Sequence, residues 1–379
     1  MKITHLELFH ISVPFAEPYH LSKIYGTQHN AHAVILKLHT DEGLFGLGEA
    51  DPMMPFTDET PQTVMAVTRD AIAPLLIGRD PVQIAMLESA LDQAIHGNLT
   101  ARGAVNMALY DILGKANNMP VRTLIGGLRH SKLPLLGGVG SGTPEETIAV
   151  IETQIETGCQ CFMIKMGALP IADEIKRMLA VKERFGNQIN IIIDANQGWE
   201  VAEALEFIDG INSCRPDLIE QPIRRWDMNG LKRIHDMSPY PLSADESLAT
   251  IQDAAMLIRE QAVDVFSIKV SKNGGIDKSK LIAQMAEAFG LKCLMNSMLE
   301  FGITQEASLQ LGCTLLNLLD SGHAYGSVLR MSDDITDFGE NISKSVVTVP
   351  SLPGLGVTLN DEKLEKYTRD YLKIDQSLI

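Results

Sequence analysis

The sequence predicts an α/β protein in which an N-terminal α+β unit precedes a closed (β/α) barrel. Over the first 119 or so residues, predicted strands come first and helices follow, which is typical of a separate α+β unit. After Gly126-Gly127, short strands rich in Val, Ile and Leu alternate with amphipathic helices, as in a parallel sheet. About seven or eight such units of about 25–30 residues fit a barrel of ordinary size.

The N-terminal unit begins as a meander. Residues 2–13 alternate polar and apolar side chains like a strand, and two further strands at 31–40 and 44–50 are joined by Asp41-Glu42-Gly43 as a hairpin. The period then becomes helical. The three expected helices span 60–77, 81–95 and 101–118, with breaks at 78–81 and at Gly97.

The second region supplies the barrel strands. Seven are expected at 133–139, 161–166, 189–196, 217–222, 241–246, 263–270 and 291–297, and a less clear one around His323. The first helix between them starts with a capping box of Thr143 and Glu146. A doubly wound sheet is the alternative, since residues 138–142 resemble a phosphate turn. The third glycine of G-x-G-x-x-G would fall on Thr143, however, so the fingerprint fails.

The C-terminal part turns strand-like again at 343–351. We expect a return to the first domain, which would give such a strand a partner; a simple tail is the alternative. The expected domains are therefore a cap of residues 1–125, joined by 345–379, and a barrel of residues 126–344.

Composition narrows the class of protein. The chain has 379 residues, with 32 basic and 48 acidic ones and a formal net charge of −16, so nucleic acid and anionic membranes are disfavoured as partners. The start lacks the features of a signal peptide, and no run of 18 uncharged apolar residues occurs. The five cysteines include no C-x-x-C pair, and one C-x-C at 159–161 is a weak metal motif. We expect free thiols and a cytoplasmic protein.

Ionisable residues recur at the ends of five successive barrel strands. They are Lys165, Asp194, Glu220, Asp245 and Lys269, spaced 24–29 residues apart. Each interval matches one β/α unit, so all five side chains are expected around the same mouth of the barrel. A single Lys or Asp at a strand end is usually a solvated loop residue. Five in this order are hard to explain without a function, because burying them is costly unless they compensate one another.

These residue types point to metal-assisted proton transfer. Three carboxylates with open positions suit Mg²⁺, with Mn²⁺ as a substitute. A lysine on either side of the trio could remove the α-proton of a carboxylate substrate while the cation stabilises the enediolate. That lysine must be neutral to act as a base, and burial, the cation and the carboxylates act on its pKa in opposing directions.

The sequence resembles the muconate-lactonizing subgroup of the enolase superfamily, the mandelate racemase/muconate lactonizing enzyme family. The resemblance runs along essentially the whole chain, in GLGEA, ALYDILGKANNMPVRTLIGG, IDANQGW, IEQP, ADES, IKVSKNGG, NSMLEFGI and HAYGSVLRMSDDI. It implies a (β/α)7β TIM-like barrel under an α+β capping domain completed by the C-terminal segment. It also implies Mg²⁺ at Asp194, Glu220 and Asp245, acid/base lysines at Lys165 and Lys269, and an oligomer.

Two departures from the family pattern bear on specificity. The usual Lys-x-Lys of the second barrel strand is Met163-Ile164-Lys165 here, so the electrostatic helper of Lys165 is missing. At the eighth strand, His323 stands where muconate cycloisomerases have an acid, and the Asp-x-Asp of dipeptide epimerases is absent. His323 is expected to contact a substrate hydroxyl or carbonyl, or to act as a further acid.

Two loops of the cap, matching 17–29 and 51–57, are expected to close over the barrel and select the substrate. The candidate substrate contacts are Met163, Asn196, Asn296, Met298, Glu300 and His323 on the barrel, and His20, Tyr25, Met54 and Phe56 on these loops. They suggest a small-molecule carboxylate with some apolar surface.

The expected activity is Mg²⁺-dependent racemisation or epimerisation of an amino-acid derivative or similar small acid. Dehydration by β-elimination and cycloisomerisation use the same enediolate and remain alternatives. A metal-free Schiff-base lyase and a non-catalytic barrel are alternatives of other classes. The expected partners are the carboxylate substrate and, in a homo-oligomer, further copies of the chain.

Overall fold

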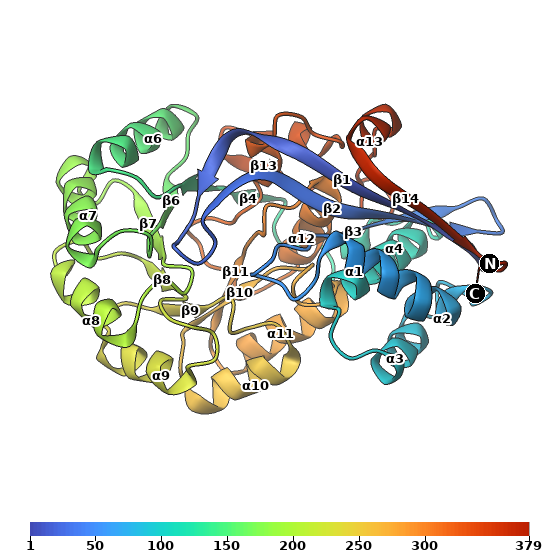
Figure 1. Cartoon of the computed structure of the whole chain (residues 1–379), viewed down its shortest axis with the longest axis horizontal. Helices are drawn as coiled ribbons and strands as arrows, with labels where there is room; N and C mark the ends of the chain where they lie inside the picture. The colour runs from blue at the N-terminus through green and yellow to red at the C-terminus, as the bar shows by residue number, and fades with distance from the viewer. Residues whose placement is uncertain (379) are drawn as a thin grey trace.

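The computed structural model describes residues 1–378 and consists of a barrel and a cap that lie side by side (Figure 1). The barrel strands form one parallel sheet in the order β11-β10-β9-β8-β7-β6-β5. Their bounds are Leu136–Val139 (β5), Cys161–Lys165 (β6), Asn190–Asp194 (β7), Leu218–Glu220 (β8), Leu242–Ala244 (β9), Val265–Ile268 (β10) and Lys292–Met295 (β11).

A helix follows each of these strands, and the helices ring the outside of the sheet (Figure 1). They are Pro144–Glu156 (α6), Ile171–Phe185 (α7), Val201–Gly210 (α8), Met228–Met237 (α9), Ile251–Glu260 (α10), Ile276–Ala288 (α11) and Gly302–Gly312 (α12). The expected capping box starts α6, where the Thr143 side chain accepts from the Glu146 N–H. The apolar faces of these helices and of the strands form the main core.

An eighth, irregular segment closes the barrel. Parallel bridges join Leu318 to Cys293 on one side and His323 to Leu135 on the other. Residues 318–323 therefore fill the gap between β11 and β5, and the expected (β/α)7β barrel is confirmed.

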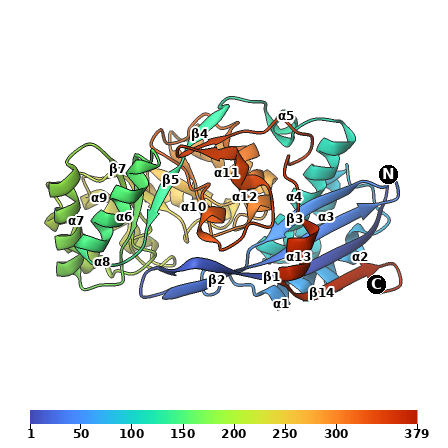
Figure 2. The same ribbon diagram turned by 90° about the horizontal axis from the view of Figure 1, so that it is seen from above.

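The cap is an antiparallel sheet in the order β14-β1-β2-β3, with helices on one face (Figure 2). Its strands are Ile3–His20 (β1), Thr27–Thr40 (β2), Phe45–Ala50 (β3) and Thr368–Asp375 (β14). Its helices are Pro61–Val67 (α1), Ala73–Leu76 (α2), Ile84–Ala94 (α3) and Leu99–Ala116 (α4), with a π-helical turn at 68–72. A second buried cluster fills the space between this sheet and the helices.

The glycines of GLGEA let β3 and α4 approach closely. A Cβ added to Gly48 would overlap the carbonyl oxygen of Ala104, and one added to Gly46 would overlap that of Ala108. The motif therefore sets the distance between the sheet and the helix.

The C-terminal return involves a different segment from the strand-like stretch at 343–351. There, Ile342–Ser343 (β12) and Val346–Thr348 (β13) form a small sheet with Lys132–Pro134 (β4), at the start of the barrel. Past helix α13 (Asp361–Tyr367), β14 pairs with β1 instead, from His5↔Asp375 to Ile11↔Thr368. Its polar sequence is compatible with this because most of its side chains are exposed or only partly buried at the edge of the sheet.

No helix within residues 1–378 is long and apolar enough to cross a membrane. All five cysteines are free and buried.

Candidate active site

The five ionisable strand-end residues meet at one mouth of the barrel. Lys165, Asp194 and Glu220 are the last residues of β6, β7 and β8, and they stand in register across the three strands. Asp245 and Lys269 directly follow β9 and β10. None of the five exposes more than 9% of its surface. The β/α repeat thus places five buried charges side by side, as its spacing predicts.

The outer carboxylates are paired with lysines. Lys165 Nζ lies 2.5 Å from Asp194 Oδ2, and Lys269 Nζ lies 2.6 Å from Asp245 Oδ2. A third lysine, Lys272, lies 2.8 Å from the other oxygen of Asp245 and also donates to its backbone carbonyl. Lys272 was not among the sequence-based candidates, although it belongs to the IKVSKNGG motif.

The central carboxylate, Glu220, is only half satisfied. Its Oε1 accepts from Asn296 Nδ2 at 2.7 Å and from Ser267 Oγ at 3.2 Å. Its Oε2 is buried without a hydrogen-bond partner among the described residues. Burial, together with the charges of Asp194 and Asp245, raises the pKa of Glu220 well above its ordinary value. A cation among these oxygens would give Glu220 Oε2 a partner and would offset the repulsion between the three carboxylates. The donor set therefore fits a hard divalent ion.

Burial lowers the pKa of each active-site lysine, but the facing carboxylates outweigh it. The pKa of Lys165 is raised by Asp194, and that of Lys269 by Asp245 and Glu220. In this arrangement both lysines are ammonium groups. Either can act as a base only when the carboxylate charge beside it is taken up by another cation.

A different cluster, His5, Glu7 and His39, brings three ligand atoms within 4.8 Å of one another on the cap sheet. The two imidazole rings stack with centroids 4.2 Å apart and planes within 5°. Parallel stacked rings cannot both hold one ion in their planes, as ligation by the ring nitrogens requires. The barrel carboxylates are therefore the better candidate for a resident metal.

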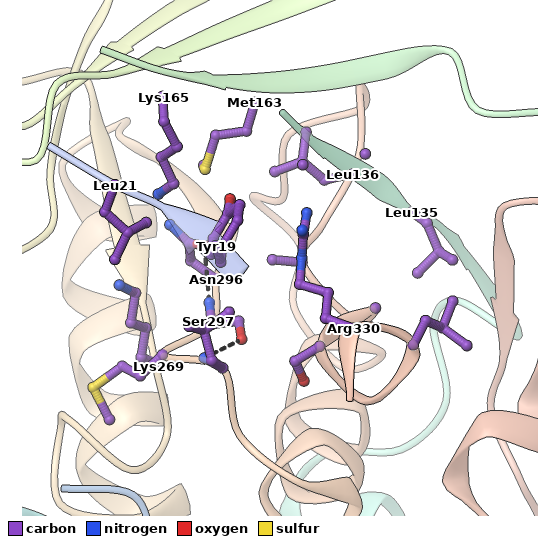
Figure 3. A pocket seen from close by; sticks show the side chains of 18 of the residues that line it. Tyr19, Leu21, Leu135, Leu136, Met163, Lys165, Lys269, Asn296, Ser297 and Arg330 are labelled. Carbon is purple, nitrogen blue, oxygen red and sulfur yellow. Dashed lines mark hydrogen bonds between the residues drawn. The ribbon is translucent and has the colours of Figure 1, made fainter. Parts of the chain in front are cut away.

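A cavity of about 400 Å³ opens above the two lysines. Figure 3 shows Lys165 and Lys269 reaching into it, with Met163 beside Lys165 and Asn296 behind. The sequence-based candidates that line it are Lys165, Lys269, Met163, Asn196, Asn296, Met298, Tyr25 and Phe56.

The tip of the β1–β2 hairpin closes over the barrel mouth. Ser22 Oγ donates to the Asn196 carbonyl at 3.0 Å, and the Lys23 N–H donates to the Gly167 carbonyl at 3.0 Å. The 51–57 loop also reaches the barrel mouth, since the Phe56 ring centroid lies 4.2 Å from Lys269 Nζ. Both cap segments thus contact the barrel mouth, the hairpin tip at Asn196 and Gly167 and the 51–57 loop at Lys269.

Four of the candidate substrate contacts, His20, Met54, Glu300 and His323, do not line the cavity, and neither do the carboxylates Asp194, Glu220 and Asp245. His20 is exposed and pairs through Nδ1 with Thr27 Oγ1 at 2.9 Å. Met54 is 58% exposed and lines a neighbouring hollow. Glu300 is buried beneath the site, where it accepts from the Met298 N–H at 2.6 Å.

His323, which was expected to contact the substrate or to act as a further acid, lies inside the barrel wall instead. Its Nδ1 accepts from the Met295 N–H at 3.1 Å, and its Nε2 donates to the Leu319 carbonyl at 3.1 Å. Burial lowers its pKa to about 4. The ring is fully buried and uses both nitrogens to hold the eighth segment against β11, so no group is left for a substrate.

The lining residues that were not identified from the sequence include Leu135, Leu136, Gly138, Ser297 and Arg330. Tyr19, a polar aromatic of the 17–29 loop, lines the cavity as well. Arg330 ends a 3-10 turn at 327–330, after the eighth segment. Its motif was noted, but it falls outside the strand-end spacing that identified the other charged residues.

Comparisons with known proteins agree with this architecture. The model of the mandelate racemase/muconate lactonizing enzyme N-terminal domain matches residues 3–126, and that of the enolase C-terminal domain-like family matches residues 146–363.

Two curated relatives cover nearly the whole chain. The N-succinyl-L-Arg/Lys racemase of Bacillus cereus is 31% identical over 369 residues, which is 97% of this chain and 98% of that protein. The L-Ala-D/L-Glu epimerase of Bacillus subtilis is also 31% identical, over 94% of this chain and 97% of that protein.

Solved structures give the same result. The crystal structure of the N-succinyl Arg/Lys racemase from B. cereus superposes with a TM-score of 0.94 at 30% identity, covering 99% of this chain and all of that one. A muconate lactonizing enzyme from Pseudomonas fluorescens, complexed with muconolactone, gives 0.93 at 32% identity, over 97% of this chain and 99% of that one.

Proposed function

The chain belongs to the mandelate racemase/muconate lactonizing enzyme family of the enolase superfamily, and from this premise we propose the following activity. The protein is an isomerase that removes the α-proton of a small carboxylate substrate to give an enediolate. Its reaction is the racemisation or epimerisation of an amino-acid derivative or a similar small acid. Two of its relatives are a racemase and an epimerase by name.

One observation carries the proposal: two buried lysines face each other across the cavity. Their strands, β6 and β10, are the second and sixth of eight positions around the barrel, which are diametrically opposite. Each lysine pairs with its own carboxylate, Lys165 with Asp194 and Lys269 with Asp245. A substrate between them has one amine on each face of its α-carbon, which is the geometry of two-base isomerisation.

The proton balance of this reaction is simple. One lysine, neutral at that moment, takes the α-proton as the C–H bond breaks, and the bonding electrons pass into the enediolate. The opposite lysine, as an ammonium group, then gives a proton to the other face of the same carbon. The two lysines have exchanged protonation states, so the reverse reaction starts from the product complex.

Asp194, Glu220 and Asp245 are the proposed ligands of Mg²⁺, with Mn²⁺ as a substitute. When bound, the ion supplies positive charge that offsets the charge developing on the substrate carboxylate. The unpartnered Oε2 of Glu220 supports this assignment. Met163 puts an apolar, buried side chain where the family pattern has a neighbouring ammonium, so burial without charge repulsion opposes the carboxylates that raise the pKa of Lys165.

The proposal is tested by α-proton exchange. Acid-sugar, amino-acid, N-acyl amino-acid, hydroxyproline and dipeptide libraries are incubated in D₂O with Mg²⁺, and deuterium uptake is read by mass. Uptake that disappears with EDTA and returns with Mg²⁺ is expected. Deuterium uptake at an unchanged rate in EDTA, or borohydride trapping of a substrate on Lys269, would point to Schiff-base chemistry instead.

The remaining parts of the proposal concern organisation. We place the first domain boundary at 125/126 and propose a homo-oligomer of the chain. The second boundary lies beyond β13 and not at the expected 344/345, because β13 pairs with β4 at the start of the barrel. Sizing by light scattering tests the second point.

A further inference from the structure

Arg177, on α7, is a buried cation without an acidic partner. Its side chain is fully buried, and it forms no ion pair within residues 1–378. Burial lowers the pKa of Arg177 to about 10, although the charges of Glu174 and Glu146 act in the opposite direction. A buried charge is costly unless it is paired and hydrogen-bonded, so a guanidinium at this position calls for an explanation. The proposed chemistry does not use it.

The guanidinium of Arg177 hydrogen-bonds to three elements at the rim of the barrel. Its Nε donates to Thr147 Oγ1, on α6, at 2.5 Å. Its Nη2 donates to the Gly140 carbonyl, just after β5, at 2.5 Å, and its Nη1 donates to the Lys165 carbonyl, at the end of β6, at 2.6 Å. The arginine therefore ties the ends of β5 and β6 to α6, and one of the groups that it holds is the backbone of an active-site lysine.

The two active-site lysines have different backbone supports. The Lys165 carbonyl also accepts from Ser141 Oγ, but at the longer distance of 3.4 Å, so Arg177 is its stronger partner. The backbone at Lys269 is held by another residue, since the Lys269 N–H donates to Asn273 Oδ1 at 3.0 Å. Because β6 and β10 lie on opposite sides of the barrel, a change at Arg177 should displace Lys165 and leave Lys269 in place.

Resting on the proposed function, we propose that Arg177 is a positioning residue for Lys165. A planar guanidinium carries its donors in a fixed fork, so the three acceptors that it holds are fixed relative to one another. This fixes the end of β6 and thereby keeps Lys165 Nζ over one face of the substrate α-carbon. Arg177 does not line the cavity, so it acts through the backbone of β6 and not on the substrate.

The test follows each enantiomer of a substrate identified by α-proton exchange. The Lys165-dependent enantiomer is defined as the one whose exchange in D₂O is lost in Lys165→Ala. In Arg177→Met, kcat for this enantiomer should fall by about tenfold to a hundredfold, because a displacement of about 1 Å can cost this much. Its KM should change by about twofold or less, and so should kcat for exchange with retention of the opposite enantiomer. A merely structural role would slow both enantiomers alike.

Further variants separate the fork from the charge. Arg177→Lys keeps the positive charge without the planar fork, so it should restore only part of kcat for the Lys165-dependent enantiomer; full restoration would assign the effect to charge and overturn the inference. Thr147→Val keeps the arginine and removes one of its acceptors, and it should slow the same enantiomer to a smaller degree. Arg184→Gln, at an exposed site on the same helix, is the matched control and should leave both enantiomers unchanged.

Crystal structures separate this inference from the proposed function. In Arg177→Met, or in Thr147→Val if the first variant does not fold, Lys165 Nζ should move by about 1 Å or more from its place beside Asp194, while Lys269 Nζ stays beside Asp245. If this displacement is seen although no carboxylate exchanges its α-proton in the wild type, the positioning role stands and the proposed function fails. If Lys165 keeps its place, or if both enantiomers slow alike, the inference is overturned.

Discussion

The two lysines should be separable by the enantiomer that each one deprotonates. Because they lie on opposite sides of the barrel, removing one leaves the other in reach of only one face of the α-carbon. In Lys165→Ala and in Lys269→Ala, racemisation should fall by about 10²–10⁴-fold, the full contribution of a general acid or base. Among residues 1–378, the only other cation lining the cavity is Arg330, which does not lose its proton in proteins and so cannot substitute as a base.

Exchange without inversion should survive in each variant. Starting from one pure enantiomer in D₂O, one variant should still incorporate deuterium with retention, and the other variant should do so with the opposite enantiomer. The assay combines mass spectrometry with chiral chromatography at saturating Mg²⁺.

Each alanine variant also removes an ammonium group from a proposed metal ligand, Asp194 or Asp245, so Mg²⁺ affinity must be measured alongside the exchange rates. Lys272→Ala is the control: it removes an equally buried lysine from Asp245 but not from the cavity lining, and it should affect both enantiomers alike. If either lysine variant still racemised at the wild-type rate, or both lost exchange with both enantiomers, the two-base assignment would be wrong.

Three further results are expected. Glu220→Gln should raise the metal-free free energy of unfolding by about 1 kcal/mol, because it removes a charge that burial and the neighbouring Asp194 and Asp245 disfavour, and should abolish the rise in Tm caused by Mg²⁺; a retained rise would contradict the ligand assignment. Burial lowers the pKa of His323 from its ordinary value of 6.5 to about 4. It is therefore neutral in the fold, and its stabilisation is lost as the pH falls from 6.5 towards 4. Going from pH 7 to 5 should cost about 2 kcal/mol through this group. His323→Gln should show a correspondingly shallower pH dependence in urea unfolding, and an unchanged slope would refute the buried neutral ring. Gly48→Ala should cost about 3 kcal/mol or more, because the new Cβ overlaps the Ala104 carbonyl. Gly339→Ala, which meets only an ordinary contact, is its control in the same denaturation assay, and equal losses would argue against close packing of β3 on α4.

The repeat of the barrel explains why so much of the fold and the chemistry was predictable. A β/α unit returns the chain to the same rim every 24–29 residues, so polar residues at apolar strand ends mark one mouth without knowledge of the folded chain. Lys165, Asp194 and Glu220 follow from this rule, and so does the closed (β/α) barrel, whereas its (β/α)7β form was implied by the family resemblance.

The errors arise where that periodicity does not apply. His323 lies on an irregular segment, where one residue of register decides between the cavity and the barrel wall. Arg330 follows a short 3-10 turn, and its position depends on Gly138 and Tyr19, which are distant in sequence. The return strand β14 is polar because it forms an edge of the cap sheet. Its sequence therefore lacks the hydrophobic alternation by which a strand is predicted.

The pairing of β1 with β14 has a consequence for synthesis. The first strand of the cap leaves the ribosome with one edge of its backbone unpaired, and the segment that covers this edge, residues 368–375, is translated only after the entire barrel. Until then the nascent cap presents an open template to neighbouring chains. Translation pauses or nonsense mutations shortly before residue 368 should therefore yield aggregated protein, even though all the strand-end residues of the barrel mouth have already been translated.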